Sequence, residues 1–391
     1  MSIVVSGLGV VSSLGIGVEE NLSQLYSGQS GISLCPEILI TNNNLPVGEI
    51  RYSNEQIKEK LGIPASKVIS RTALLGMLAV KEAIIDSQID VTSYKIGLIS
   101  STSVGGMDQT EIFFKDYIKD NTKGDLRQVL MHDCAASTKA ICNYCNINGY
   151  STTISTACSS SANAIIKGYN LLKHGVLDAV IVGGCDALSA FTLNGFKSLM
   201  ILDKELCKPF DERRAGLNLG EGAGYIVLQR EEDCNKKYCR LSGFANTNDA
   251  FHQTASSENG EGAYLAMNKA LSMAGLHPES IDYINAHGTG TPNNDLTESI
   301  AISRIFNQNM PLICSTKSYT GHTLAASGGI EAVFSILSIK EGFVPESLNF
   351  AVPMHNGVIP NTSLHRQEIK TVLSNSFGFG GNCSTLIFSK Q

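Results

Sequence analysis

The sequence lacks long apolar runs and long basic runs. No stretch approaches about 18 uninterrupted apolar residues, the length that predicts a membrane-spanning helix. Basic residues never occupy more than two or three consecutive positions and the net charge is −6, so no segment is suited to neutralise a nucleic-acid backbone. The first nine residues carry neither a basic region nor a cleavage site, which favours a short strand over a signal peptide. We expect a cytoplasmic protein without a membrane or nucleic-acid partner.

Regular cysteine spacing is also missing. Eleven cysteines, an odd number scattered through 391 residues, argue against a disulfide framework, so most should be reduced and structural. Cys142 and Cys145 form a Cys-x-x-Cys with His132 and Cys134 nearby, a combination that also occurs at zinc sites. The segment 127–145 has a helical pattern with small residues, and no second Cys-x-x-Cys lies at zinc spacing. We therefore predict helix packing here and no metal.

Length and composition predict a large α/β protein. The chain exceeds the roughly 250–300 residues at which a single core stops growing, so two core units or a duplication are expected. Hydrophobic residues make up 43% and charged residues only 17%, with 37 glycines, which suits tight packing with many short turns. In the first half, strand-like runs alternate with helical patterns, which predicts parallel strands covered by helices. The expected strands there are 3–11, 95–101, 151–156, 178–183 and 222–228, and the expected helices are 71–87, 108–119 and 159–174.

A second series of the same kind begins near Arg240. Its expected strands are 241–247, 281–286, 371–376 and 384–389, and its expected helices are 261–274, 294–306 and 323–340. The two series open alike, because the run Val-Ser-Gly-Leu that includes Gly7 is echoed by Leu-Ser-Gly-Phe around Gly243. We therefore predict a duplicated βα core, with halves over residues 1–239 and 240–391.

A cysteine stands between a predicted strand and a predicted helix, in Ser-Thr-Ala-Cys-Ser-Ser-Ser around Cys158. Unpaired backbone N–H groups and the positive end of the helix dipole favour a thiolate at such a place. A small buried cysteine would fit the same position, so a base and an oxyanion site must come from elsewhere. Under a duplication, the glycine-rich loop from Phe377 to Gly381 would be the counterpart of the Cys158 loop.

Two of the eight histidines lie in loops rich in glycine and threonine, directly after predicted strands. His287 stands in Ala-His-Gly-Thr-Gly-Thr-Pro and His322 in Lys-Ser-Tyr-Thr-Gly-His-Thr. Parallel α/β sheets place their ligand sites in loops at strand ends. The two histidines are therefore expected to converge on Cys158.

Together these motifs resemble those of the elongating I/II type β-ketoacyl-[acyl-carrier-protein] synthases of the thiolase-fold superfamily, with a specialised aryl-polyene or polyketide ketosynthase as a narrower resemblance. The matching motifs are TACSSS at Cys158, Lys208-Pro209-Phe210-Asp211 leading into Gly220-Glu221-Gly222-Ala223-Gly224, AHGTGTPNND at His287, KSYTGHTLAASG at Lys317 and His322, and NSFGFGGN at Phe377 to Asn382. The resemblance implies a thiolase-like α/β fold, in which the duplicated core forms a five-layered α-β-α-β-α sandwich.

The resemblance also implies an acyltransferase. Cys158 would carry an acyl thioester, malonyl-carrier protein would lose CO2, and the resulting enolate would attack to give a 3-oxoacyl-carrier protein, in fatty-acid, polyene or polyketide elongation. His287 and His322 would donate N–H groups to the enolate oxygen, and the backbone N–H groups of Cys158 and Phe379 would hold the second oxyanion. The acyl groups would arrive on the phosphopantetheine arm of acyl carrier protein, so no other cofactor is expected.

Further roles follow from the same motifs. Lys317 resembles the family's active-site lysine and Glu298 its expected partner, since buried ions of opposite sign need pairing. Phe379 resembles a gate that moves to admit malonyl substrate. The residues expected to contact substrate are Val104, Thr289, Thr291, Phe377 and Gly378. The small side chain of Val104 should leave room for medium or long acyl chains.

The chain departs from the family at one loop and excludes three related classes. Where the family commonly has Arg-Asp-Gly-Phe, this chain has Ala215 and Leu217 at the second and fourth positions, which predicts altered gating or acyl preference. A chain-length factor, a catalytically silent partner of a ketosynthase, would lack Cys158. A thiolase would have a C-terminal Cys-x-Gly, whereas Cys383 is followed by Ser-Thr. Initiating synthases pair cysteine with histidine and asparagine, whereas this chain supplies a second histidine, His322.

Two kinds of protein partner are expected. Acyl carrier protein is acidic, so it should dock on basic side chains near the tunnel mouth, and Lys67 and Arg71 are the candidates. The chain should also form a homodimer, or a heterodimer with a related ketosynthase-like subunit.

Overall fold

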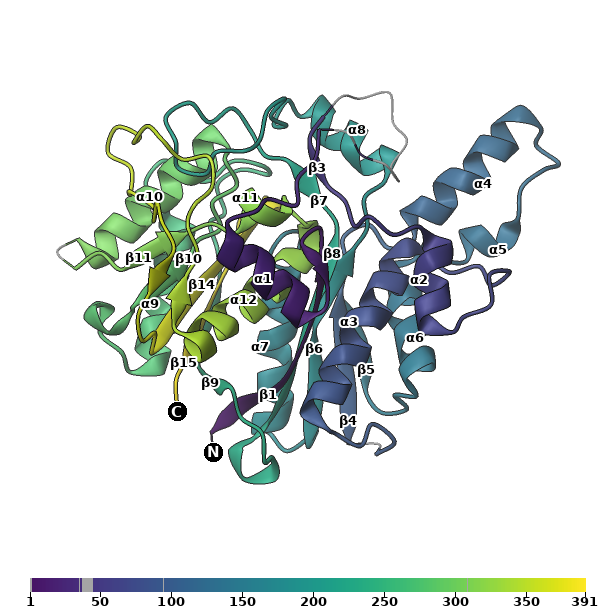
Figure 1. The fold of residues 1–391 in the computed structure, drawn as a ribbon, viewed down its shortest axis with the longest axis horizontal. Coiled ribbons are helices and arrows are strands. Elements are labelled where there is room, and N and C mark those ends of the chain that lie inside the picture. Colours follow the sequence, from purple (N-terminus) through teal and green to yellow (C-terminus); the bar gives the residue numbers. More distant parts are fainter. Residues whose placement is uncertain (1, 35, 37–44, 94, 308) are drawn as a thin grey trace.

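The computed structural model describes residues 2–391 except 35, 37–44, 94 and 308 (Figure 1). An eleven-stranded sheet has the order β11-β10-β14-β15-β9-β1-β8-β6-β4-β5, with β2 beside β1. The strands are β1 (Ile3–Ser12), β2 (Gly15–Ile16), β3 (Val47–Gly48), β4 (Ile96–Ser101), β5 (Ser151–Ile154), β6 (Ala179–Asp186), β7 (Leu219–Gly220), β8 (Gly222–Arg230), β9 (Cys239–Asn248), β10 (Tyr283–Asn285), β11 (Leu312–Cys314), β12 (Phe343–Val344), β13 (His365–Arg366), β14 (Thr371–Gly378) and β15 (Asn382–Ser389). The helices are α1 (Val18–Ser27), α2 (Asn54–Leu61), α3 (Arg71–Ser87), α4 (Met107–Lys119), α5 (Leu126–Val129), α6 (Cys134–Cys145), α7 (Ser160–Lys173), α8 (Ala190–Ser198), α9 (Glu261–Ala274), α10 (Pro292–Phe306), α11 (Lys317–Thr320) and α12 (Ser327–Glu341), with 3-10 turns η1 (Glu231–Asp233), η2 (Pro278–Ser280), η3 (Leu324–Ala326) and η4 (Phe379–Gly381).

The sheet consists of two halves with the same topology. Each half runs outward from the centre through two antiparallel pairs and then two parallel pairs, as β1-β8-β6-β4-β5 and as β9-β15-β14-β10-β11. A short antiparallel contact between β1 and β9, at Val4–Arg240 and Val5–Cys239, joins the halves. The duplicated βα core predicted from the sequence is confirmed.

Gly7 and Gly243 show why the two series open alike. A Cβ atom on Gly7 would lie 2.5 Å from the carbonyl oxygen of Ala83 in α3, and one on Gly243 would lie 2.4 Å from that of Ala270 in α9. Only glycine permits such a close approach of strand to helix. The equivalent glycines therefore seat equivalent helices on the first strand of each half.

One detail of the predicted duplication is wrong. Cys158 follows β5, whose equivalent in the other half is β11, whereas the loop from Phe377 to Gly381 joins β14 to β15, the equivalents of β6 and β8. The counterpart of the Cys158 loop is thus the segment after β11, which carries Lys317 and His322. The sequence repeat located the halves but not the pairing of their loops.

Five layers result from the way the helices cover the two halves. Helices α3 and α6 pack on the outer face of the N-terminal half, and α9 packs on that of the C-terminal half, with α10 beside it. Helices α7 and α12 lie between the halves and contact strands of both (Figure 1). Every residue of α12 from Ser327 to Ile339 is buried, as expected for a helix enclosed by protein on all sides. This is the α-β-α-β-α sandwich that the resemblance implied.

The segment that contains the Cys-x-x-Cys is not one continuous helix. It splits into α5 and α6, and α6 begins after Asp133, whose carboxylate accepts a hydrogen bond from the Ala135 N–H at 2.6 Å. Helix α6 packs on α3, and Cys142 is buried. In the part of the chain that the structure describes, one group of metal-type side chains has ligand atoms close together, and it contains neither Cys142 nor Cys145. No helix of the described residues is both long enough and apolar enough to cross a bilayer.

Candidate active site

Cys158 lies buried in the turn between β5 and α7, where the sequence predicted it. The preceding residue, Ala157, has φ +53°, a left-handed conformation that residues other than glycine rarely adopt. The Ser160 side chain stabilises this turn, since its hydroxyl accepts from the Thr156 N–H at 2.8 Å and donates to the Ala157 carbonyl at 2.5 Å. The turn holds the cysteine in place at the start of α7.

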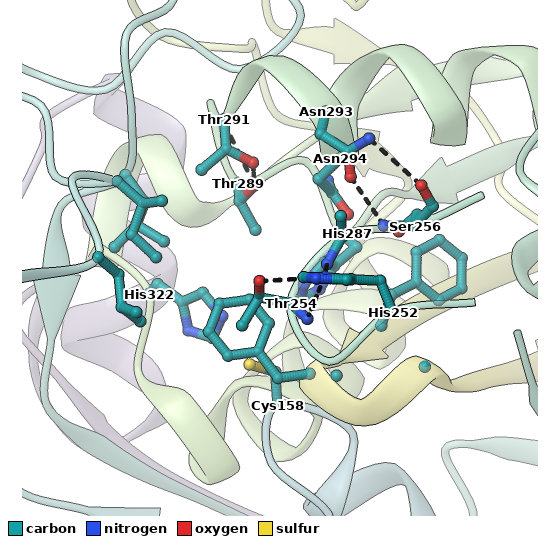
Figure 2. A pocket seen from close by; sticks show the side chains of 18 of the residues that line it. Cys158, His252, Thr254, Ser256, His287, Thr289, Thr291, Asn293, Asn294 and His322 are labelled. Atoms are coloured by element: carbon teal, nitrogen blue, oxygen red, sulfur yellow. Dashed lines mark hydrogen bonds between the residues drawn. The ribbon is translucent and has the colours of Figure 1, made fainter. Parts of the chain in front are cut away.

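His287, after β10, and His322, after α11, come together with Cys158. The sulfur of Cys158 and one ring nitrogen of each histidine all lie within 4.8 Å of one another. The two imidazoles are nearly perpendicular, at 89°, with ring centroids 5.5 Å apart. Figure 2 shows the three side chains in the wall of one cavity. The expected convergence of the three loops is therefore what the structure has.

Hydrogen bonding assigns the tautomer of His322. The Leu324 N–H donates to Nδ1 at 3.0 Å, so in the neutral ring the proton is on Nε2. Burial and the Lys317 ammonium hold the pKa values of both histidines well below their usual range. Near neutral pH both rings are therefore uncharged, and Nε2 of His322 can donate a hydrogen bond.

The same contact argues against a metal in this group. One cysteine and two histidines match the donor types of zinc sites. A metal at Nε2 would require the proton on Nδ1, but Nδ1 already accepts the Leu324 N–H. His322 is thus arranged to donate a hydrogen bond from Nε2 rather than to bind a metal ion.

Lys317 pairs with Glu331 rather than with Glu298, so the predicted ion pair is wrong. Both Lys317 and Glu331 are at most 3% exposed, and the ammonium contacts the Glu331 carboxylate. Glu298 lies behind the His287 loop, where its carboxylate accepts from the N–H groups of His287 at 2.9 Å and Gly288 at 2.8 Å. The Asn375 amide also donates to Glu298 at 3.1 Å.

The sequence carries a signal for the role of Glu331 that the resemblance to the family did not include. It is the one acidic residue between positions 323 and 340, in a stretch otherwise made of apolar and small residues. Such a stretch predicts a buried helix, and a carboxylate inside it requires a buried cation. Lys317 stands 14 residues earlier, at the start of the motif that leads into this stretch.

Burial governs the acidity of the Cys158 thiol. It raises the pKa to about 11, although Lys317 and the backbone N–H groups of Phe379 and Cys158 act in the opposite direction. The helix start therefore does not make a resting thiolate, contrary to the expectation from sequence. At neutral pH the thiol keeps its proton until a reaction partner arrives.

The loop after β14 contacts Cys158 through its backbone. The Phe379 N–H points toward the thiol, and the Phe379 ring stacks on Phe196 with centroids 6.1 Å apart. Gly380 and Gly381 have φ values of +82° and +77°, which a side chain would strain. The aromatic ring is thus carried by a segment with high backbone freedom.

Two cavities meet at Cys158. The entrance cavity, of about 300 Å³, is lined by both histidines and by polar groups, and its rim includes the Asn293 amide, which bonds to the Ser256 backbone (Figure 2). The second, which we call the apolar cavity, has about 510 Å³. Its lining includes Val104, Phe191, Gly195 and Leu324. The residues shared by both cavities are Cys158, Phe196, Leu199 and Phe379.

Comparison with known proteins agrees with this arrangement. The profile of the beta-ketoacyl synthase N-terminal domain matches residues 1–234, and that of the beta-ketoacyl synthase C-terminal domain matches residues 238–351. The chain belongs to the β-ketoacyl synthase family. The 3-oxoacyl-[acyl-carrier-protein] synthase 2 of Staphylococcus aureus is 32% identical to it, over 99% of this chain and 98% of the relative.

Solved ketosynthases have the same fold. The structure of the ishigamide ketosynthase/chain length factor matches with a TM-score of 0.92 and 27% identity, over 100% of this chain and 99% of that one. A chain in the structure of a ketosynthase in complex with its chain length factor, from Xenorhabdus doucetiae, matches with a TM-score of 0.87 and 32% identity, over 100% of this chain and 98% of that one.

Within this β-ketoacyl synthase, the other expected residues divide between the two cavities. Thr289, Thr291, Phe377 and Gly378 line the entrance cavity, and Val104 lines the apolar cavity. Of the two departures from the family pattern, Leu217 lines the entrance cavity, whereas Ala215 is exposed and lines neither. An effect of this loop on substrate is therefore expected from Leu217 rather than from Ala215.

The prediction that acyl carrier protein docks on Arg71 is wrong. It is 5% exposed and its guanidinium binds both carboxylate oxygens of Glu221, at 2.6 and 2.8 Å, as well as the carbonyls of Ile50 and Tyr52. The Arg71 side chain fastens α3 to the loop before β8 and cannot reach a partner. Lys67 is exposed, beside a cavity that Lys139 also lines, and stays a prediction.

Proposed function

We propose that this protein is a 3-oxoacyl-[acyl-carrier-protein] synthase, which condenses an acyl thioester with malonyl-carrier protein and releases CO2. The observation that carries the proposal is the cluster of Cys158, His287 and His322, within 4.8 Å, where the entrance cavity meets the apolar cavity. A nucleophile and two neutral N–H donors are what a decarboxylating condensation requires, because no strong base is needed.

The first half-reaction transfers the acyl group to the cysteine. Sulfur of Cys158 attacks the thioester carbonyl, the bond to the pantetheine sulfur breaks, and the thiol proton ends on the released pantetheine thiol. The negative oxygen of the intermediate is stabilised by the backbone N–H groups of Cys158 and Phe379, the donors that already lower the pKa of the thiol. The acyl chain then occupies the apolar cavity.

The second half-reaction uses the two histidines. The bond between the malonyl carboxylate and its methylene carbon breaks, CO2 leaves, and the electron pair forms an enolate at the thioester. His287 and His322 donate N–H to its oxygen, for which their low pKa values are suited because a neutral ring keeps one donor. The enolate carbon attacks the acyl carbonyl, and the Cys158 thiolate departs.

Lys317 acts on both steps as a positioning residue. Its ammonium lowers the pKa of the thiol and of both histidines, and Glu331 holds it between the halves. Glu298 orients the His287 loop through two backbone hydrogen bonds. Phe379 is the gate between the cavities, with Phe196 as the ring on which it rests.

The substrate and partners follow from the cavities and the surface. The apolar cavity suits a medium or long acyl chain, in fatty-acid or in polyene or polyketide elongation. We propose a dimer, with a second copy or with a ketosynthase-like subunit, as in the two related structures solved with chain length factors. Strand β5 is the end of the sheet, which is a template for pairing with another chain. Large apolar side chains are exposed on the same side, on and beside α4, α5 and α8 (Figure 1): Ile112, Phe114, Tyr117, Ile118, Leu126, Leu130, Phe191, Leu199 and Met200.

Acyl carrier protein is the proposed donor of both substrates, with Lys67 as a contact. The ten cysteines in the described part of the chain are all free, which supports a reducing, cytoplasmic location.

Mass spectrometry of the acylated protein tests the proposal. The purified protein is incubated with a panel of acyl-carrier proteins, and the added mass is located in its peptides. We expect it on Cys158, with release of CO2 once malonyl-carrier protein is added. Cys158→Ser should remove the stable adduct while Cys383→Ser, a change at another buried cysteine, should keep it. Acylation of a different residue overturns the mechanism.

A further inference from the structure

Asp186, the last residue of β6, is a fully buried carboxylate without a cation. Its side chain is 0% exposed, and no salt bridge reaches it from any described residue. A buried charge needs pairing or several hydrogen bonds to be tolerated. Its retention in the core therefore calls for a specific reason.

Hydrogen bonds from two separate segments supply that stabilisation. From the turn after β4, the Thr102 hydroxyl donates to Asp186, as do the backbone N–H groups of Ser103, at 3.0 Å to each oxygen, and Val104, at 3.2 Å. From η3, the Ala325 N–H donates at 2.8 Å. One carboxylate thus connects the end of β6 to the turn that holds Val104 and to the segment that follows His322.

The η3 segment needs this support because Leu324 is strained. Its φ of +53° is in the left-handed region, which costs a residue with a side chain about 1–2 kcal/mol. In that conformation Leu324 directs its own N–H to Nδ1 of His322, while the next N–H, that of Ala325, points to Asp186. The Leu324 side chain lines the apolar cavity, as Val104 does.

We propose that Asp186 is a positioning residue that fixes His322 as the Nε2–H tautomer, acting through the backbone N–H groups of Ala325 and Leu324. The proposal deepens the proposed function and rests on it for the catalytic consequence. The hydroxyls of Ser161 and Ser101 also hold this segment, by donating to the Ala325 carbonyl. Without the carboxylate, the Ala325 N–H loses its acceptor, and the left-handed conformation that directs the Leu324 N–H to His322 is less well supported.

Ser327 does not replace this contact. Its hydroxyl lies 3.2 Å from Nδ1 of His322. A hydroxyl can donate or accept, so it fits either tautomer, whereas the Leu324 N–H can only donate. Selection of the Nε2–H form therefore depends on Leu324, and through Ala325 on Asp186.

The variant Asp186→Asn tests the proposal with two independent readouts in the full-length protein. The asparagine side chain has the same size as aspartate, but it can accept hydrogen bonds only at its one amide oxygen and not at both positions, as the carboxylate does. In protein with ¹⁵N-labelled histidine, we expect the two His322 ring nitrogens to change from a single Nε2–H pattern to an exchange average; the signal is assigned by its absence in His322→Gln. We also expect malonyl decarboxylation to fall at least about tenfold, the value of one strong hydrogen bond, while Cys158 acylation stays within about twofold.

Two further variants keep the test sharp. Thr102→Val removes one donor to Asp186 but keeps the carboxylate. It should therefore change the His322 pattern and the decarboxylation rate less than Asp186→Asn does. It should also fold even if Asp186→Asn does not. Asp282→Asn is the matched control, because Asp282 also accepts two backbone N–H groups, from Lys370 and Thr371, but lines neither cavity. It should leave the ratio of the two half-reactions unchanged.

The outcomes separate this inference from the proposed function. An unchanged His322 pattern in Asp186→Asn, or an equal fall in both half-reactions, overturns the positioning role. If the unmodified protein performs neither half-reaction, the proposed function fails, and the ¹⁵N readout still decides whether Asp186 fixes the tautomer.

Discussion

Lys317 and Glu331 form an ion pair that is buried between the two halves of the sheet, and neither is more than 3% exposed. Lys317 follows β11 and Glu331 belongs to α12, so the pair connects the loop that carries His322 to the central helix layer. Charges buried in this way are retained for what they do to their neighbours, since apolar residues would stabilise the core at least as well. Here the neighbours are Cys158 and both histidines, whose pKa values the ammonium lowers.

Breaking this pair should strongly destabilise the fold. In Glu331→Gln, Lys317 is left buried without its counter-ion, and we expect the free energy of unfolding to fall by about 3–5 kcal/mol. Urea denaturation measures the change. The double variant Lys317→Met with Glu331→Leu should recover most of the loss. The exposed pair Lys340–Glu341 provides the control, where Glu341→Gln should cost less than about 1 kcal/mol. A loss equally small at Glu331 would mean that the pair is solvated in solution.

Glu298 should make the fold less stable as the pH rises. Burial raises its pKa to about 7, against an ordinary value of 4.5, so the folded protein holds this proton over a range where the unfolded chain has lost it. The stabilisation of the fold that results from this raised pKa is therefore fully present below about pH 4.5 and is lost as the pH rises through about 7. Glu298→Gln should flatten this slope in denaturation curves measured between pH 4.5 and 8. Glu205→Gln, which removes an exposed carboxylate with a lowered pKa, should not. An identical slope in Glu298→Gln and the unmodified protein contradicts the assignment.

Gly195 should set the length of acyl chain that fits. It lies inside α8 and lines the apolar cavity, and a Cβ atom there would meet nothing within 4 Å. No close contact requires glycine at this position, although glycine in a helix costs about 1 kcal/mol relative to alanine. Gly195→Leu should therefore shorten the longest acyl group accepted in the carrier-protein panel. Gly195→Ala, the control, should raise the melting temperature and keep most of the range. An unchanged chain-length profile in Gly195→Leu would place the acyl chain elsewhere.

The sequence predicted the parts of the site that depend on topology. Cys158, His287 and His322 each stand in a loop after a strand, and the strands β5, β10 and β11 present those loops on the same side of the fold. The sequence did not predict the partner of Lys317, because that depends on which helix packs against which layer of the fold. Glu298 and Glu331 both lie on helices after histidine loops, but only α12 passes between the halves and reaches Lys317.

Arg71 shows the same limit for a surface residue. An arginine at the start of a helix resembles an exposed side chain in sequence, because its partner Glu221 stands 150 positions away. The long apolar stretch that follows Arg71 was the available sign that this helix is buried on most sides.

The thiol of Cys158 should react slowly with alkylating agents at neutral pH. Its pKa of about 11 means that only a small fraction is thiolate at pH 7, and the rate with iodoacetamide should rise steadily up to about pH 10. The double variant Lys317→Met with Glu331→Leu should be slower at every pH, because the ammonium that lowers this pKa is gone while no charge is left unpaired. Peptide mass spectrometry of the alkylated protein follows Cys158 separately from the other cysteines. A rate that levels off below pH 8 would show that the Cys158 thiolate is stabilised at rest, and acylation would then need no change of environment when the substrate binds.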